Sequence, residues 1–350
     1  MSQGLEGVVA AETALSMVDG ERGELIIAGY SVEELAPNAT FEETVQLLGV
    51  SPAGDREMPP IAHAVLRAAA KRNDDPMDAL RAAAGLLVPD QLFAAFPTIV
   101  ATYWRILHNQ QPIAPRNELR HAANYLYMLS GEVPSAEHVR ALETYLNTVV
   151  DHGLNASTFT ARVITSTGSD LVSAIVGAVG ALKGPLHGGA PGPALDMVFE
   201  IGDASRAEEV LRRKIEAGER LMGFGHRVYK VRDPRADVLA AAAERLLGGD
   251  PLYDLAKNVE RMAIRLLEEY KPGRRLQTNV EFYTALLLHG LGLETPLFTP
   301  TFAISRVAGW IAHCLEQRRS NRLIRPQSVY VGPRGLHWQR RAGSQPAQSA

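Results

Sequence analysis

Two glycines, a histidine and several cations lie close together between residues 221 and 235. The stretch reads Leu-Met-Gly-Phe-Gly-His-Arg-Val-Tyr-Lys-Val-Arg-Asp-Pro-Arg. Gly223 and Gly225 allow a tight bend and a close approach to a ligand, because glycine carries no Cβ. His226 can exchange a proton near neutral pH, and the cations around it suit phosphates and carboxylates. The stretch indicates an anion site with an acid–base group inside it; a loop of structural glycines with a solvated basic surface is the alternative.

A second histidine, His187, lies in a segment that is dense in glycine and proline. The segment reads Lys-Gly-Pro-Leu-His-Gly-Gly-Ala-Pro-Gly and follows an apolar run over residues 171–182. Proline and glycine at this density end a helix, so we expect His187 on a turn. Metal-binding histidines more often lie at close spacing on one helix face, and no Cys, Asp or Glu stands here at ligand spacing. The sequence therefore predicts no metal.

A carboxylate, Glu281, lies in the segment Arg-Arg-Leu-Gln-Thr-Asn-Val-Glu-Phe-Tyr, which begins at residue 274. A carboxylate between apolar neighbours is partly desolvated, and desolvation raises its basicity. The alternative is an ordinary acid in the first turn of a helix, stabilised by the helix dipole. Position alone favours this alternative.

In this order, the three segments resemble the citrate synthase family, and the likeness extends from about residue 5 to residue 333. His187 matches the histidine of the family's Gly-Pro-Leu-His-Gly-Gly turn, and His226 matches the histidine of Gly-Phe-Gly-His. Glu281 stands where the family has the catalytic Asp of Asn-Val-Asp-Phe-Tyr, so the acid is longer by one methylene. Further matches surround His152, Arg306 and Arg325.

The resemblance implies condensation of acetyl-CoA with oxaloacetate and water to give citrate and CoA. Such a reaction needs a base for the thioester methyl group and a donor for the developing enolate oxygen. Glu281 would be the base, His187 would hydrogen-bond the thioester oxygen, and His226 would polarise the ketone of oxaloacetate. No cofactor is implied, because acetyl-CoA is a substrate.

The resemblance also implies two sets of binding residues. Guanidinium groups match carboxylates with paired hydrogen bonds, and the residues implied for oxaloacetate are His152, Arg235, Arg306 and Arg325. The residues implied for CoA are Leu221, Met222, Gly223, Phe224 and Gly225 near the adenine, with Lys230 and Arg232 facing phosphates. For Lys230 and Arg232, a solvated surface charge is the alternative.

Two other functions remain open. A 2-methylcitrate synthase using propionyl-CoA would share the same polar residues, and one methylene changes discrimination by only about 1 to 3 kcal/mol. A paralogue that binds acyl-CoA without catalysis is a third possibility, because the family's Asp is Glu281 here.

Hydrophobic periodicity predicts a mainly α-helical protein. Apolar residues recur along one helix face at Leu252, Leu255, Val259, Met262 and Leu266. Capping boxes predict three helix starts, at Ser31/Glu34, Thr40/Glu43 and Ser205/Glu208. The only extended segments expected are residues 8–10 and 25–27, on either side of a turn at Asp19-Gly20.

The resemblance implies two helical domains. A large discontinuous domain would comprise residues 1–186 and 290–333, and a small domain of residues 187–289 would carry His226 and Glu281. It also implies a homodimer in which Arg325 reaches into the partner's site. The segment 334–350 lacks apolar surface for packing and is expected to be a disordered tail.

Composition agrees with a two-domain enzyme. A chain of 350 residues exceeds the size at which a single core stops growing. A net charge of −3, from 36 basic and 39 acidic residues, argues against a nucleic-acid partner. The single cysteine, Cys314, excludes an internal disulfide and suits a reducing compartment. The run 171–182 is about half the length of a membrane span, and no secretion signal is visible, so a cytoplasmic protein without a membrane partner is expected.

Overall fold

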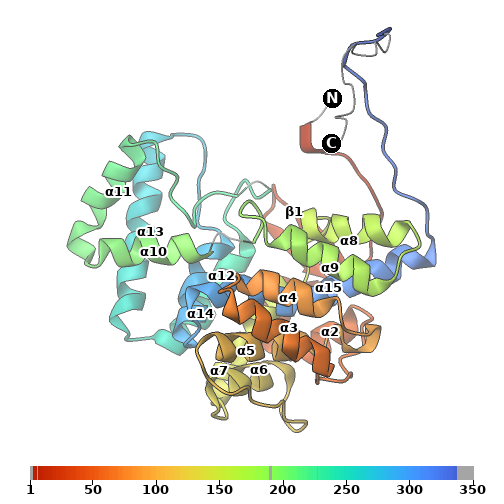
Figure 1. Cartoon of the computed structure of the whole chain (residues 1–350). Coiled ribbons are helices and arrows are strands. Elements are labelled where there is room, and N and C mark those ends of the chain that lie inside the picture. The colour runs from red at the N-terminus through yellow and green to blue at the C-terminus, as the bar shows by residue number, and fades with distance from the viewer. Residues whose placement is uncertain (1–2, 6, 189–190, 227, 337–350) are drawn as a thin grey trace, which may run out of the picture.

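The structure is a computed structural model that describes residues 3–5, 7–188, 191–226 and 228–336. The protein is mainly α-helical, as predicted, with fifteen α-helices in these ranges (Figure 1). The helices are α1 (Val32–Asn38), α2 (Phe41–Leu47), α3 (Pro60–Lys71), α4 (Pro76–Ala84), α5 (Phe96–Leu107), α6 (His121–Ser130), α7 (Ala136–Val149), α8 (Ala156–Ser166), α9 (Leu171–Leu182), α10 (Pro191–Ile201), α11 (Ala207–Glu216), α12 (Pro234–Leu247), α13 (Pro251–Tyr270), α14 (Val280–Gly290) and α15 (Phe298–Arg319).

Two of the three predicted helix starts are confirmed. Ser31 caps α1 by accepting a hydrogen bond from the Glu34 N–H. Thr40 and Glu43 form a complete capping box at the start of α2, in which each side chain binds the other residue's backbone N–H. Both caps satisfy N–H groups that have no partner within the helix.

The third predicted start, at Ser205, is wrong. The Asp203 carboxylate instead accepts a hydrogen bond from the Ser205 N–H at 2.8 Å, so Ser205 lies inside a short 3₁₀ turn, Ala204–Arg206. The helix α11 begins after that turn, and Glu208 pairs with Arg212 rather than closing a capping box. Asp203, two residues upstream of Ser205, thus caps the 3₁₀ turn, and α11 begins without a side-chain cap.

A small antiparallel sheet precedes the helices. Its strands are β1 (Ser16–Asp19), β2 (Glu24–Ile27) and β3 (Tyr30–Ser31), and β1 pairs with β2 with Val18 opposite Leu25. The predicted strand at 25–27 and the turn at Asp19-Gly20 are confirmed. The predicted strand at 8–10 is wrong, because those residues are exposed and belong to no ladder.

The segment 187–289 contacts the rest of the chain chiefly through α12, which packs against α1 and α7. Within this segment α12 packs on α14, and α11 packs on α13 at one side of the molecule (Figure 1). The helix α15 is buried over most of its length and packs against α7, α8 and α9. The division into two domains stays a prediction.

The remaining two observations concern the C-terminal tail and membrane-spanning helices. The predicted disordered tail lies outside the described residues from 337 onward. Within the described part of the chain, no helix combines the length and apolar character needed to cross a bilayer.

Candidate active site

The loop that carries His226 is tied to the segment that leads into α14. The Asn279 N–H donates to the Gly223 carbonyl at 3.0 Å, and the Asn279 side-chain amide donates to the Gly225 carbonyl at 2.8 Å. The Asn279 side-chain oxygen also accepts a hydrogen bond from the Glu281 N–H at 3.0 Å, which caps α14. One asparagine therefore joins the two segments that the sequence singled out for His226 and Glu281.

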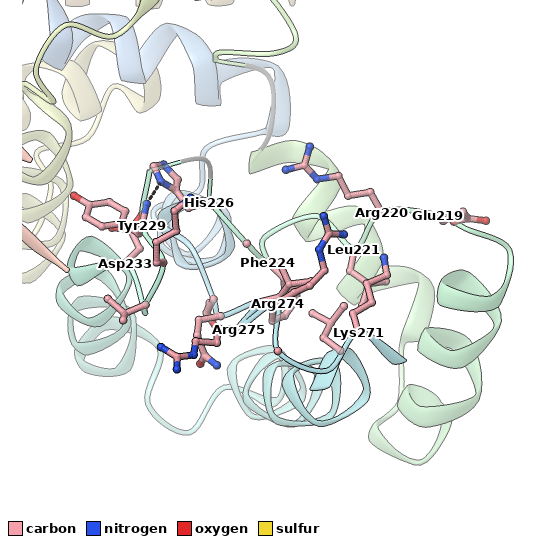
Figure 2. Close-up of a pocket in the computed structure, with 18 of the residues that line it drawn as sticks. Glu219, Arg220, Leu221, Phe224, His226, Tyr229, Asp233, Lys271, Arg274 and Arg275 are labelled. Atoms are coloured by element: carbon pink, nitrogen blue, oxygen red, sulfur yellow. Dashed lines mark hydrogen bonds between the residues drawn. The ribbon is translucent and has the colours of Figure 1, made fainter. Parts of the chain in front are cut away.

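His226 is held as a neutral ring with a defined proton position. Its Nδ1 lies 3.1 Å from the backbone nitrogens of both Val228 and Tyr229 (the dashed line in Figure 2 marks the second contact). A backbone N–H can only donate, so Nδ1 accepts and Nε2 carries the proton. Burial, followed by the charge of Arg235, lowers the pKa of His226 to about 4. The ring therefore presents an Nε2–H donor at neutral pH.

A second histidine, His152, lies beside the first. The ring centroids of His152 and His226 are 5.9 Å apart, and His152 Nε2 lies 3.0 Å from the Tyr229 hydroxyl. Burial holds the pKa of His152 well below its ordinary value, and the charges of Arg235 and Arg306 act in the same direction. Two neutral histidines thus share one corner of the site.

Arg235 is a buried cation that is already neutralised. Its guanidinium meets Asp233 through two contacts, at 3.0 Å from Nε and 2.8 Å from Nη2. Asp233 also accepts a hydrogen bond from the Val280 N–H at 3.3 Å, which links the start of α12 to the start of α14. The Arg235 Nη2 atom lies 3.4 Å from His226 Nε2. A guanidinium can only donate, so with the proton on Nε2 the two groups are neighbouring donors rather than hydrogen-bond partners, and both can point at one ligand oxygen.

Arg306 is a buried cation that no carboxylate of the described residues contacts directly, although the charge of Asp151 acts on it from farther away. Only 1% of it is exposed, on the buried helix α15. Its Nε donates to the Val149 carbonyl at 2.7 Å, and its guanidinium lies 4.6 Å from the Phe302 ring centroid. Among the described residues, no carboxylate oxygen lies within 4.0 Å of it. Burial lowers its pKa to about 10, so it stays charged at neutral pH.

Glu281 lies in the first turn of α14, the place expected if it were only an acid stabilised by the helix dipole. It is also half-buried, and burial raises its pKa, although the charges of Arg235 and Arg220 oppose the rise. The desolvation expected from its apolar neighbours is therefore present. Its side chain is a stronger base than an exposed glutamate.

His187 lies on the predicted turn and faces Ser157 of α8. Its Nε2 is 2.8 Å from the Ser157 hydroxyl and 3.4 Å from the Ser157 backbone N–H, while Trp310 Nε1 donates to the same hydroxyl at 3.1 Å. Because the backbone N–H must donate, Nε2 accepts and Nδ1 carries the proton. Burial, followed by the charge of Arg306, lowers the pKa of His187 to about 4.

A cavity of about 680 Å³ begins at His226 and Tyr229 and extends away from them (Figure 2). Of the residues predicted to bind CoA, those that line it are Leu221, Phe224, Gly225 and Lys230. Four further cations, which the sequence analysis did not single out for this role, line it as well: Arg220, Lys271, Arg274 and Arg275.

The structure does not bring the other predicted CoA residues to this cavity. Arg232 is half-buried and pairs with Asp237 and Glu260, the latter at 3.0 Å, so its charge is already compensated. Met222 packs against the core, and the Gly223 carbonyl is taken by the Asn279 N–H.

Arg325 is the remaining residue that was predicted to bind oxaloacetate. Arg325 is exposed, in an extended segment after α15 that leaves the helical body (Figure 1). The side chains that sequence reasoning missed are of two kinds. Tyr229 and Asp233 lay within the first segment, Arg274 and Arg275 within the third, and Ser157 within the match around His152. Arg220 and Lys271 gave no signal, because nothing in their spacing shows which way they face.

Comparison with known proteins places the chain in a family. Residues 4–327 match the family model described as citrate synthase, C-terminal domain. The chain is 41% identical to citrate synthase 2 of Bacillus subtilis, covering 95% of this chain and 96% of that one. It is 38% identical to a 2-methylcitrate synthase of Shewanella oneidensis, with 94% of each chain covered.

One solved structure is informative about ligands. It is the ternary complex of citrate synthase from the archaeon Thermoplasma acidophilum with carboxymethyl coenzyme A and oxaloacetate. It is 31% identical, covers 98% of this chain and 99% of that chain, and gives a TM-score of 0.86. Fold and relatives together define a helical acyl-group transferase. The chain belongs to the citrate synthase family, which confirms the resemblance.

Proposed function

We propose that the protein condenses acetyl-CoA with oxaloacetate and water to give citrate and CoA. The observation that carries the proposal is the buried guanidinium of Arg306, which no carboxylate of the described residues contacts directly, together with neutral His152 and His226. A buried cation without a partner is costly, and an anionic ligand that forms paired hydrogen bonds would offset the cost. Oxaloacetate, a dianion with a ketone, offers a carboxylate to Arg306 and a carbonyl oxygen to His226.

The first chemical step is removal of a proton from the thioester methyl group. Glu281 takes the proton on its carboxylate, whose raised pKa suits a base. The Nδ1–H of His187 donates to the thioester oxygen, where negative charge develops. A neutral histidine suits this task, because it stabilises the charge without a full cation at the site.

The second step forms the carbon–carbon bond. The enolate carbon attacks the ketone carbon of oxaloacetate, and the ketone oxygen becomes an alkoxide that accepts the Nε2 proton of His226. The proton that Glu281 took from the methyl group then returns to Nε2 of His226, which restores both residues. Water then adds to the thioester carbonyl of citryl-CoA, the C–S bond breaks, and CoA leaves as the thiol. Arg235, held by Asp233, contributes a fixed donor beside the reacting ketone.

An assay with acetyl-CoA and propionyl-CoA in parallel, each with oxaloacetate, tests the proposal. We expect release of CoA with the larger kcat/KM for acetyl-CoA. A preference for propionyl-CoA would support a 2-methylcitrate synthase, the activity named for the Shewanella oneidensis relative. Binding of acyl-CoA without turnover of either substrate would support the non-catalytic paralogue.

We further propose a homodimer whose two sites each take Arg325 from the partner subunit. The exposed, extended segment that carries Arg325 supports this arrangement, because an exposed side chain beyond the last helix is available to a neighbouring subunit. Arg325→Ala and His187→Ala variants should each be impaired, and mixing them should restore part of the activity through hybrid dimers with one intact site. No recovery despite demonstrated subunit exchange would contradict a shared site.

A further inference from the structure

The turn of the N-terminal hairpin, residues 20–23, lies directly against the loop 228–232 that follows His226. The Gly20 carbonyl accepts a hydrogen bond from the Lys230 N–H at 2.8 Å. A Cβ added to Gly20 would lie 2.2 Å from the Val228 carbonyl oxygen. The two backbones therefore touch at a point where there is no room for any side chain.

The turn does not itself require glycine at this position. Gly20 is absent from the residues with a left-handed backbone, whereas its neighbour Gly23 has φ +71°. Alanine would therefore fit the conformation of Gly20 in an isolated hairpin. The need for glycine arises from the contact with the loop, and the obstructing atom is backbone, which cannot move aside as a flexible side chain could.

The loop residues that Gly20 touches are the ones that fix the His226 ring. The N–H groups of Val228 and Tyr229 bind Nδ1 of His226, and the next N–H, that of Lys230, binds the Gly20 carbonyl. Three successive peptide groups are thus shared between the histidine and the hairpin. A displacement of the loop at Gly20 would carry the two donors away from His226.

The same hairpin holds the other substrate histidine from its far end. The Ser16 hydroxyl, in β1, donates to the Asp151 carboxylate at 2.5 Å and accepts a hydrogen bond from the Gly153 N–H at 2.9 Å. These are the residues immediately before and after His152. The strand β1 therefore binds the residues on either side of His152, while the turn that follows β1 binds the loop that follows His226.

We propose that the β1–β2 hairpin is a positioning element that sets His152 and His226 relative to each other, with Gly20 as its contact to the His226 loop. The inference rests on the proposed function, in which both histidines face oxaloacetate. Gly20 and Ser16 touch no reacting atom and act through the backbones that they hold.

The first test compares Gly20→Ala with Gly85→Ala. Gly85 lies at the end of α4 with ordinary φ, and a Cβ there would meet nothing closer than 3.7 Å, so it is a matched control. We expect Gly20→Ala to lower kcat/KM for oxaloacetate by about a hundredfold, the effect of a displacement of about 1 Å in an active site. Parent-like kcat/KM in a folded Gly20→Ala variant would overturn the proposal.

A second pair of variants, at Ser16, tests the proposal in case Gly20→Ala does not fold. Ser16→Ala removes the hydroxyl that holds both neighbours of His152, and Ser16→Thr keeps it. We expect Ser16→Ala to raise KM for oxaloacetate several-fold and Ser16→Thr to restore it, with equal thermal midpoints for the two. Equal KM for both variants would contradict the role of the hairpin.

A readout that does not depend on turnover separates this inference from the proposed function. The ¹⁵N shifts of His226, assigned with a His226→Gln variant, report which ring nitrogen carries the proton. We expect a protonated Nε2 in the parent and in Gly85→Ala, and a mixture of tautomers with a pKa raised from about 4 toward 6.5 in Gly20→Ala. An unchanged tautomer and pKa in Gly20→Ala would overturn the inference even if condensation itself is confirmed, and an inactive parent would count against the function alone.

Discussion

Positive charge differs between two regions of the site. We call the buried region of Arg235 and Arg306 the inner end, and the cavity that begins at His226 and Tyr229 the outer end. At the inner end, Arg235 and Arg306 are 5% and 1% exposed, and each is anchored by hydrogen bonds to fixed groups. At the outer end, the cavity is lined by arginines that are exposed, such as Arg220, Arg274 and Arg275 (Figure 2).

The difference follows from the cost of removing charge from water. A buried guanidinium is tolerated only where neighbours and ligand compensate it, so its geometry is fixed and its loss is costly. An exposed cation costs little, contributes little in one geometry, and mainly raises the local concentration of an anion. We therefore expect strong, specific effects from the inner end and weak, salt-dependent effects from the outer end.

The largest effect is expected at Glu281. Glu281→Gln keeps the shape of the side chain and removes the base, so kcat should fall by about a thousandfold, within the range for general-base catalysis. Calorimetry should show oxaloacetate binding close to that of the parent. Glu281→Asp should also be slower, because the pocket is fitted to the longer acid; a faster Asp variant would favour the impaired paralogue.

Arg306→Lys should have the next largest effect. Lysine keeps the charge but cannot form paired hydrogen bonds with a carboxylate, and each bond to a charged group contributes about 1.5 to 3 kcal/mol. We expect KM for oxaloacetate to rise by about ten- to a hundredfold. Arg319→Lys, at the exposed end of the same helix, is the control. Equal KM values for the two variants would show that Arg306 does not bind the substrate.

The pH dependence should be set by Glu281 rather than by the histidines. His187 and His226 have pKa values lowered to about 4, so both are neutral above that pH. Burial raises the pKa of Glu281 above that of an ordinary glutamate, so the base is lost by protonation as pH falls into the acid range. We expect kcat/KM for acetyl-CoA to drop about tenfold per pH unit below the Glu281 pKa. A flat profile down to the histidine pKa would contradict the assignment.

The smallest effects are expected at the outer cations. Arg274→Gln and Arg275→Gln should each raise KM for acetyl-CoA only about two- to fivefold, as exposed ion pairs contribute less than about 1 kcal/mol. The increase should shrink at high salt, where exposed charges are screened. A hundredfold increase that persists in salt would mean that these side chains become buried against the ligand, and the contrast with the inner end would disappear.

The sequence predicted the parts of this molecule whose signals are local. The spacing of apolar residues predicted the helical face of residues 252–266, and Thr40 with Glu43 predicted a helix start. The segments around His187, His226 and Glu281 could also be recognised as candidate sites, because glycine, proline and asparagine residues that shape them lie next to them in the chain.

The sequence could not predict what depends on partners distant in the chain. Arg232 looked like a phosphate ligand, but Glu260 and Asp237 compensate its charge. Gly20 looked like an ordinary turn residue, and its contact with the Val228 carbonyl appears only in three dimensions. Burial of Arg306 without a directly paired carboxylate is likewise a property of the packed helix, not of its sequence.

The most direct test of the account is proton exchange at the methyl group of acetyl-CoA, measured by NMR in deuterated water with an unreactive analogue of oxaloacetate. This measurement isolates the first chemical step from condensation and hydrolysis. If Glu281 is the base in a site completed by the dianion, the parent should exchange the methyl protons only when the analogue is present, and Glu281→Gln should exchange them at least about a hundredfold more slowly. Equal exchange rates for the parent and Glu281→Gln would show that Glu281 is not the base and would contradict the mechanism.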